Sequence, residues 1–363
     1  MSNNDRYSRQ SKVKGWNQES ISSSQVIIVG VGALGSVVAL NMVMAGVGKV
    51  VLIDMDTIEL SNLNRQVLFK ESDIGKFKSE IAKVALSQIN PNCIIETYTK
   101  RVQEVPNSTF TLKKSKKNQK NPKLIIVDAL DNFETRRWLN SLIVSKSLPM
   151  VSGGMYGTLG NVQVIIPNET PCLECQPLIP ERELQKACSL PGEVRKAKKM
   201  EENVNIEISL SEKSEISDED YFPALGSVSS IIGGIMSHET LNLIHDDKKT
   251  HPVLDKYLFV DIHHQSYLQV PLMKRDDCIV CSNNYKLKGI PFIVEKNDTL
   301  KIFREKISLQ FNLVEDSITI SSLGKDLTGD KSLLNQILKE SSSVYVFGNE
   351  LPLPMKLQIQ WTS

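Results

Sequence analysis

An early switch in the hydrophobic pattern predicts a strand, a glycine turn, a helix and a second strand. Residues 25–29 form a short β-branched run, residues 34–44 repeat apolar positions at helical spacing, and residues 49–53 form a second apolar run. The sequence GVGALG, from Gly30 to Gly35, separates the first strand from the helix. This order is typical of the first unit of a doubly wound, Rossmann-like α/β sheet.

The glycine turn predicts a nucleotide site. Gly30 and Gly32 lack the Cβ atoms that would keep a phosphate away from the backbone, and the helix that begins around Ala33 and Gly35 offers unpaired N–H groups. Asp54, on the second strand, is placed to hold a ribose hydroxyl. No Lys-Ser or Lys-Thr pair follows the glycines, so the turn is not a P-loop.

The pattern predicts further elements and a second domain. Strands are expected at 94–101, at 124–132, as a pair within 150–166 and from Tyr257, and helices at 74–89 and 223–244. Residues 282–289 change in composition, and we interpret them as a linker between a domain at 1–281 and one at 290–363. The second stretch alternates strand and helix patterns, which predicts a small α+β domain with one modest core.

Charged and polar residues follow the predicted strands. Ligands bind outside the carboxyl ends of the strands in a doubly wound sheet, so Asp128 or Asp131 is expected to face the site and could hold magnesium. Capping of the next helix by Asp131 or Asn132 is the alternative. Arg65 and Lys78 lie on the segment that leaves the second strand, where spacing alone leaves phosphate binding and an ordinary surface role equally open.

The cysteines predict a metal site. Cys172 and Cys175 form one C-x-x-C pair and Cys278 and Cys281 another, which together supply four soft ligands for structural, tetrahedral zinc. A redox dithiol would need only one pair. Cys188 stands apart between loop-like flanks rich in Lys and Arg, which would lower the pKa of its thiol if they lie close to it.

Composition narrows the function classes. The chain has 363 residues, a formal charge of +1 and 23% charged residues, which gives no indication of a nucleic-acid or anionic-membrane partner. Its apolar runs are too short to span a bilayer, and the polar N-terminus lacks the apolar stretch of a signal peptide. Paired cysteines that suit a metal better than disulfides favour a cytoplasmic protein.

In order along residues 5–281, the chain carries R-x-Y/x-R-Q, G-x-G-x-x-G, D-x-D with S-N-x-x-R-Q, G-x-x-K, D-x-x-D-N and two C-x-x-C pairs. This series resembles the activating enzymes of ubiquitin-like proteins, the superfamily that includes the sulfur-carrier adenylyltransferases MoeB and ThiF. The resemblance implies a site for ATP and Mg²⁺. It assigns the ATP ribose to Asp54, phosphates to Asn62, Arg65 and Lys78, magnesium to Asp131, and the triphosphate of the partner subunit to Arg9, while Asp56 and Asn132 belong to the same motifs.

Two features separate the branches of this superfamily. The sequence Ala187-Cys-Ser-Leu resembles the segment that carries the catalytic cysteine of the eukaryotic-type enzymes, which implies a catalytic-cysteine insertion at about 182–222 around Cys188. The segment 290–363 resembles the β-grasp, ubiquitin-fold domain that recruits a conjugating enzyme, and MoeB and ThiF lack it. The insertion is far shorter than in the eukaryotic enzymes, and one chain carries the whole active half, which favours a homodimer.

The expected function is ATP-dependent adenylation of the C-terminal glycine of a ubiquitin-like protein ending in Gly-Gly. A thioester on Cys188 and transfer to a conjugating enzyme would follow. A sulfur-carrier adenylyltransferase with no obligatory thioester is the main alternative. An NAD-dependent oxidoreductase is less consistent with the basic residues and cysteine pairs, and a catalytically inactive adaptor is less consistent with the full set of nucleotide-site residues.

Overall fold

The computed structural model describes most of the chain. The described residues are 6–112, 122–175, 223–282 and 290–362, apart from 248, 277, 279, 312, 323–324, 328, 330–331, 339–342 and 349–354. All but the first residue of the predicted linker at 282–289, and the whole of the expected catalytic-cysteine insertion at about 182–222, therefore lie outside the described residues.

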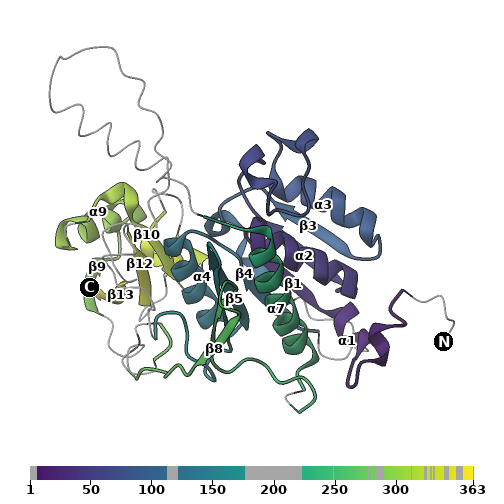
Figure 1. Ribbon diagram of the computed structural model, residues 1–363. Coiled ribbons are helices and arrows are strands. Elements are labelled where there is room, and N and C mark those ends of the chain that lie inside the picture. Colours follow the sequence, from purple (N-terminus) through teal and green to yellow (C-terminus); the bar gives the residue numbers. More distant parts are fainter. Residues whose placement is uncertain are drawn as a thin grey trace.

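An eight-stranded sheet forms the centre of the first domain (Figure 1). Its order is β3-β2-β1-β4-β5-β6-β7-β8, with β1 to β5 parallel and the last three strands antiparallel. The strands are β1 (Gln25–Val29), β2 (Lys49–Ile53), β3 (Ile94–Tyr98), β4 (Leu124–Asp128), β5 (Met150–Tyr156), β6 (Leu159–Ile165), β7 (Tyr257–Asp261) and β8 (Ser266–Val270). From β1 the strands are added first toward β3 on one side of the sheet and then, from β4 onward, on the other side. The strand order therefore reverses between β1 and β4, which is where such folds bind ligands. The predicted doubly wound α/β class is confirmed.

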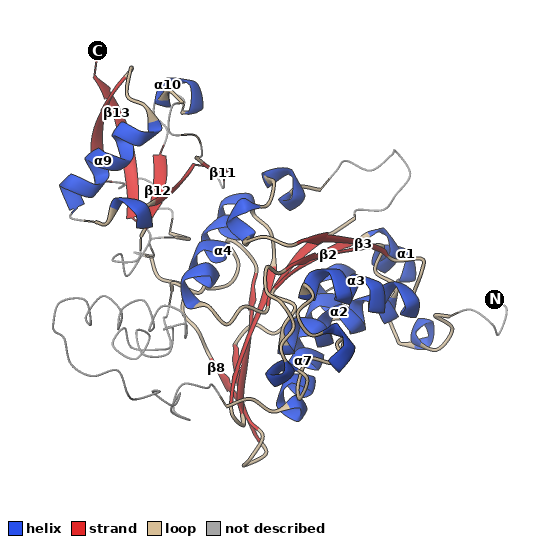
Figure 2. Ribbon diagram, turned by 90° about the horizontal axis from the view of Figure 1, so that it is seen from above, coloured by secondary structure: helices blue, strands red, loops and turns tan. Residues whose placement is uncertain are grey.

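Helices cover both faces of this sheet (Figure 2). One face carries α1 (Gln18–Ser23), α2 (Ala33–Ala45), α3 (Lys78–Ile89) and α7 (Gly226–His245), and the other carries α4 (Phe133–Lys146). Alternate strand residues point to opposite faces, so Ile28 of β1 joins the core under α2 and α7, whereas Ile27 joins the core under α4. Both side chains are fully buried, and the sheet therefore separates two cores.

The second domain is a smaller α+β unit. Its sheet has the order β11-β10-β12-β13-β9, in which β9 is an edge strand parallel to β13. The elements are β9 (Ile290–Glu295), α9 (Leu300–Phe311), β10 (Thr319–Ser322), β11 (Lys325–Asp326), α10 (Leu334–Ile337), β12 (Ser343–Phe347) and β13 (Met355–Thr362). Phe303 and Ile307 of α9 pack on Phe292 and Leu357 of the sheet in a separate core. The assignment of this unit as a β-grasp domain stays a prediction.

The second domain docks on α4 of the first. Phe347, at the end of β12, is buried in the core that contains Trp138 of α4. Burial raises the pKa of Asp326 on β11 to about 6, and a hydrogen bond with Trp138 opposes this shift. The strand β9 forms the opposite edge of the small sheet from β11.

Most predicted elements agree with the structure, but α4, α1, β8 and β11 were missed. The helix α4 follows Asn132, whose side chain accepts a hydrogen bond from the Thr135 N–H, a standard helix-start signal. The six-residue α1 contains a single apolar residue, and the edge strand β8 buries none of its five residues, so neither gives a clear pattern. The strand predicted at 94–101 ends at Tyr98. Among the described residues, no helix is long and apolar enough to cross a membrane.

A pair of stacked histidines lies at the C-terminal end of α7. The His245 ring stacks on His251 at 4.2 Å between centroids and meets Trp16 edge-on at 4.9 Å. Both ring nitrogens of His245 are buried with no hydrogen-bond partner among the described residues. Burial, with a smaller contribution from His251, lowers the pKa of His245 to about 4.

This depressed pKa predicts a loss of stability in mild acid. Between pH 6.5 and 4 the unfolded chain takes up a proton that folded His245 resists, so the free energy of unfolding should fall as the pH is lowered. We expect His245→Phe to remove this component, worth about 1 kcal/mol at pH 5 after allowance for partial exposure. Urea unfolding at pH 7 and pH 5 measures it, with exposed His264→Phe as control. Equal pH dependence in wild type and His245→Phe would contradict the prediction.

Candidate nucleotide and metal sites

The three glycines of the turn have three different surroundings. Gly30 has a φ of +87°, and a Cβ atom there would lie 2.6 Å from the Ala129 carbonyl oxygen at the end of β4. A Cβ atom on Gly35 would lie 1.8 Å from the Gly30 carbonyl oxygen, so helix and turn touch directly. Gly32 faces open space, where the nearest atom to a Cβ would be Nε2 of Gln66 at 3.8 Å. The turn thus provides the close backbone approach that a phosphate requires.

The N-terminus of α2 points its N–H groups into this space. Gly32 is the N-cap residue and supplies no side-chain acceptor, so the first N–H groups of the helix lack intrahelical partners. The preceding Val31 N–H donates to Oδ2 of Asp54 at 2.6 Å, which ties the turn to the end of β2. Unpaired N–H groups and the positive end of the helix dipole together favour an anion here.

An acid and a lysine lie together beyond β2. Asp54 is nearly buried, and its Oδ1 accepts a hydrogen bond from the Asp56 N–H at 2.8 Å. Burial raises the pKa of Asp54, an effect that the nearby Lys78 ammonium opposes. The Nζ of Lys78 lies 3.0 Å from Oδ2 of Asp56. The structure therefore joins the predicted residues Asp54, Asp56 and Lys78 in one charged group beside the glycine turn.

The other predicted phosphate residues lie on the segment after β2. Asn62 ends the 3-10 helix η2 (Leu60–Asn62), and its Oδ1 accepts a hydrogen bond from the Glu59 N–H at 3.1 Å. Arg65 uses Nη1 to donate to the Ser61 carbonyl at 2.7 Å. The Ser229 hydroxyl at the start of α7 donates to the Arg65 carbonyl at 3.4 Å, so α7 supports this segment from behind.

The structure separates the roles of the acids after β4. Asp128 is fully buried, and its Oδ2 pairs with Nε of Arg136 at 2.9 Å and accepts from the Ser152 hydroxyl at 2.8 Å. These partners leave Asp128 no access to a metal. Asp131 is exposed, and Asn132 caps α4. Of the two candidates for magnesium, only Asp131 is accessible, and the capping alternative applies to Asn132.

Arg9 is far from the nucleotide turn of its own chain. It precedes the 3-10 helix η1 (Gln10–Lys12), and Nε2 of Gln10 donates to the Ala45 carbonyl at 2.8 Å, at the C-terminus of α2. The glycine turn lies at the other end of this 13-residue helix, about 20 Å away. Arg9 is exposed, so it can meet another molecule but not the turn of its own subunit.

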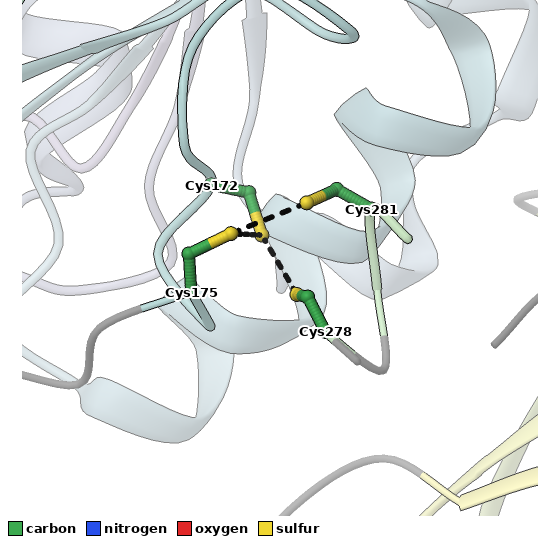
Figure 3. A group of neighbouring side chains, drawn as sticks. All are labelled: Cys172, Cys175, Cys278 and Cys281. Atoms are coloured by element: carbon green, nitrogen blue, oxygen red, sulfur yellow. Dashed lines mark hydrogen bonds between the residues drawn. The ribbon is translucent and has the colours of Figure 1, made fainter. Parts of the chain in front are cut away.

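Four cysteines converge on the α4 side of the sheet (Figure 3). The Sγ atoms of Cys172 and Cys175 are 3.9 Å apart, and they lie 3.6 Å and 3.3 Å from those of Cys278 and Cys281, respectively. Tetrahedral zinc with Zn–S bonds of about 2.3 Å requires separations of about 3.8 Å between sulfurs. All four side chains are buried, and the arrangement fits one tetrahedral ion.

Sequence reasoning missed the ion pair that supports this cluster. Glu174, inside the first C-x-x-C pair, is buried and receives a hydrogen bond from Nη2 of Arg137 at 3.1 Å. Burial raises the pKa of Glu174, and Arg137 opposes the shift. Asn140 of the same helix accepts from the Leu173 N–H at 3.1 Å, so α4 holds the first cysteine pair in place. An acid between two cysteines was the available signal.

The expected nucleophile, Cys188, lies outside the described residues, as do the Lys and Arg residues that flank it. The structure resumes at residue 223, where the Pro223 carbonyl accepts a hydrogen bond from the Gly157 N–H at 2.7 Å beyond β5. The described residues on either side of this segment are therefore Cys175, in the cysteine cluster, and Pro223, shortly before α7.

The fold and this site define a family. The sequence profile of the ThiF family matches residues 7–280, which include the glycine turn, the charged group after β2 and three of the four clustered cysteines. The chain belongs to the ThiF family.

Similar proteins from other organisms narrow this class. The NEDD8-activating enzyme E1 catalytic subunit of Caenorhabditis elegans is 28% identical over 84% of this chain and 80% of its own length. The protein of the same name from Dictyostelium discoideum is 24% identical over 93% of this chain and 89% of its own. Among solved structures, E. coli MccB superposes with a TM-score of 0.58 at 22% identity, over 78% of this chain and 75% of that one, which supports the fold alone.

Proposed function

We propose that this protein activates a ubiquitin-like protein with ATP, as the catalytic chain of an activating enzyme. The observation that carries this proposal is the coverage of the relatives. Similarity to NEDD8-activating catalytic subunits extends over most of both chains and beyond the ThiF-matched residues. The open face of Gly32 and the anion-binding end of α2 are the structural support for ATP as the substrate.

The first step is adenylation. A C-terminal glycine carboxylate oxygen attacks the α-phosphorus of ATP, and the bond to the leaving pyrophosphate breaks. A carboxylate is already a nucleophile, so no general base is needed. In this proposal Asp54 holds the ribose, while Arg65 and Lys78 stabilise the charge that moves onto pyrophosphate. Lys78 would exchange its present partner Asp56 for phosphate oxygens.

Asp131 is the residue we assign to magnesium, which would neutralise phosphate charge when bound. Its exposed carboxylate at the carboxyl end of the sheet is the support for this assignment, together with the pairing of Asp128 to Arg136. Asn62 stays the proposed polar contact to the phosphates, on the turn that also carries Arg65.

The second step is thioester formation on Cys188. The thiolate attacks the carbonyl carbon of the acyl-adenylate, AMP leaves with the bonding pair, and the thiol proton passes to solvent. Because an ordinary cysteine is only a few per cent ionised at neutral pH, the cations near Cys188 in the sequence would assist by stabilising the thiolate.

The C-terminal domain is the proposed recruiter of a conjugating enzyme. A groove of about 440 Å³ lies between β9 and α9, lined by Pro291, Phe292, Ile293, Lys306, Leu309 and Gln310. Leu309 is 85% exposed and Ile293 is 60% exposed, which is unusual for apolar side chains without a partner. The groove lies at the edge of the small sheet opposite the edge that docks on α4, so a conjugating enzyme bound there would not displace the domain.

We propose that the four clustered cysteines hold one structural zinc ion, which joins two segments 106 residues apart. This set of thiols suits a reducing compartment, which supports a cytoplasmic location. The expected result is one zinc per chain by elemental analysis, and a marked loss of thermal stability when Cys278→Ser is combined with Cys281→Ser. The matched control is Cys93→Ser, outside the cluster. Well-folded protein without zinc would contradict the proposal.

The central test is a non-reducing gel and mass spectrum of the full chain, together with any subunit that co-purifies. It is incubated with ATP, magnesium and β-grasp proteins that end in Gly-Gly. We expect a thiol-sensitive adduct in wild type and none in Cys188→Ala, while both proteins catalyse pyrophosphate exchange. Leu309→Glu should form the adduct normally and fail to pass it to a conjugating enzyme.

The controls distinguish the alternatives. Exposed Val84→Glu on α3 introduces the same kind of change as Leu309→Glu away from the groove, and should leave transfer intact. Pyrophosphate exchange by both wild type and Cys188→Ala, with no adduct on either protein, would instead favour a sulfur-carrier adenylyltransferase. A melting temperature raised by NAD but not by ATP would overturn the proposal in favour of an oxidoreductase.

We propose that the active assembly is a dimer of ThiF-type subunits, and that a second copy of this chain supplies Arg9 to the triphosphate. The position of Arg9 at the far end of α2 supports a role in another subunit. Exposed Leu60 and Val67, which flank the predicted phosphate residues, provide apolar surface for the partner. The relatives are named "catalytic subunit", so the alternative is a dimer with a different kind of subunit. Light scattering must distinguish a homodimer of this chain from such a dimer.

A mixing experiment tests the partner role of Arg9. We expect Arg9→Ala and Lys78→Ala each to abolish pyrophosphate exchange while the dimer persists. Co-refolding the two variants should restore part of the activity, because a mixed dimer contains one site with both Lys78 and the partner's arginine. Exposed Lys12→Ala on η1 is the control and should be active. No recovery from a confirmed mixed dimer would exclude a homodimer with this exchange of arginines.

A further inference from the structure

The N-terminal segment that carries Arg9 is tied to the fold on both sides of that residue. On one side, Nη1 of Arg6 donates to the Ile89 carbonyl at 2.8 Å, at the C-terminal end of α3. On the other side, Nε2 of Gln10 donates to the Ala45 carbonyl at 2.8 Å, at the C-terminal end of α2. The segment is therefore attached to the ends of two neighbouring helices.

Tyr7 packs its ring on the end of α2. Gly46 follows that helix with a φ of +83°, and a Cβ atom there would lie between 2.4 and 2.6 Å from three atoms of the tyrosine side chain. A glycine at this position both adopts the left-handed φ and leaves room for the ring. Asn90, the fully buried C-cap residue of α3, donates to the Tyr7 hydroxyl and to the Val43 carbonyl, at 2.9 Å in each case. Tyr7 is thus held by both helices.

The backbone that follows Tyr7 forms a closed turn. The N–H and the hydroxyl of Ser11 both donate to the Tyr7 carbonyl, at 3.0 Å and 2.9 Å, and the Lys12 N–H donates to the Arg9 carbonyl at 3.2 Å. Arg9 is the N-cap residue of η1, so its backbone is part of this turn. The direction in which the Arg9 side chain leaves the backbone therefore depends on where Tyr7 is held.

The guanidinium of Arg9 contrasts with this fixed backbone. The residue is exposed, and its side chain makes no hydrogen bond or ion pair within the described part of the chain, whereas Arg6 in the same segment uses its guanidinium to hold α3. The glycine turn of its own subunit lies about 20 Å away, at the other end of α2. Such an arginine suits a phosphate of another molecule, because only its side chain has to be ordered on binding.

We propose that Tyr7 is a positioning residue that presents Arg9 to the triphosphate bound by the partner subunit. This inference rests on the proposed function and its exchange of arginines within a dimer. Tyr7 lies at the far end of α2 from its own glycine turn, so it acts through the backbone of Arg9 on the site of the other subunit. Loss of the ring misplaces the guanidinium, and a displacement of about 1 Å in such a group can lower the rate about 100-fold.

Mixed dimers of full-length chains test this role. Tyr7→Ala alone should exchange pyrophosphate about 100-fold more slowly than wild type, remain a dimer by light scattering, and bind AMP, which lacks the outer phosphates, as wild type does. Co-refolded with Lys78→Ala, it should recover activity, because one site of the mixed dimer then has both Lys78 and a correctly presented arginine. Co-refolded with Arg9→Ala, it should recover nothing, because neither chain presents a usable arginine.

The opposite pattern would overturn the inference. If Tyr7 instead supports the nucleotide site of its own subunit, Tyr7→Ala should recover with Arg9→Ala and not with Lys78→Ala. Unchanged exchange in Tyr7→Ala would also overturn it. Lack of recovery from Arg9→Ala with Lys78→Ala would overturn the exchange of arginines and this inference with it. Lack of any pyrophosphate exchange in wild type would instead overturn the proposed function.

Two further variants keep the comparison specific. Tyr7→Phe retains the ring on Gly46 and loses only the hydroxyl that Asn90 contacts, so we expect a smaller loss with the same pattern in mixed dimers. This variant takes the place of Tyr7→Ala if the larger change prevents folding. Tyr267→Ala, at an exposed tyrosine of β8, makes the same chemical change away from the N-terminal segment and should match wild type in every mixture.

Discussion

The rest of this structure depends on the direct contact between the start of α2 and the glycine turn. The Gly30 carbonyl lies where a side chain on Gly35 would begin, and Gly30 itself is pressed against the end of β4. This contact sets the direction of α2 and leaves its first N–H groups facing open space. It also brings Val31 within hydrogen-bonding distance of Asp54, so the acid at the end of β2 is oriented by the same turn.

The large sheet separates two hydrophobic cores, and different groups of site residues lie on its two faces. On the face of α2, α3 and α7, close packing places the phosphate-site residues around the turn, and Ser229 of α7 supports the Arg65 segment. On the face of α4, the same helix contacts the cysteine cluster through Arg137 and the C-terminal domain through Trp138. The residues around the glycine turn and the cysteine cluster thus belong to opposite faces of the sheet, while α4 connects the cysteine cluster with the second domain.

The comparisons and the geometry support the proposed function in different ways. The match to the ThiF family covers the glycine turn and three of the four clustered cysteines. MccB has a similar fold at low identity, so its likeness says little about the substrate of this chain. The similarity to NEDD8-activating catalytic subunits covers 84% and 93% of this chain and so extends beyond the ThiF-matched residues, and this is what favours protein activation over sulfur-carrier chemistry.

The sequence by itself determined the parallel sheet, the glycine turn, Asp54 and the two cysteine pairs, because each depends on local periodicity or on short fixed spacings. It could not choose between Asp128 and Asp131, since that choice depends on Arg136 and Ser152 reaching Asp128 from other elements. It missed α4, whose apolar face is interrupted by polar residues that contact distant segments. Only the tertiary structure decided that Lys78 meets Asp56 and that Arg9 lies away from its own turn. These are contacts between residues far apart in the chain, and local patterns carry no record of them.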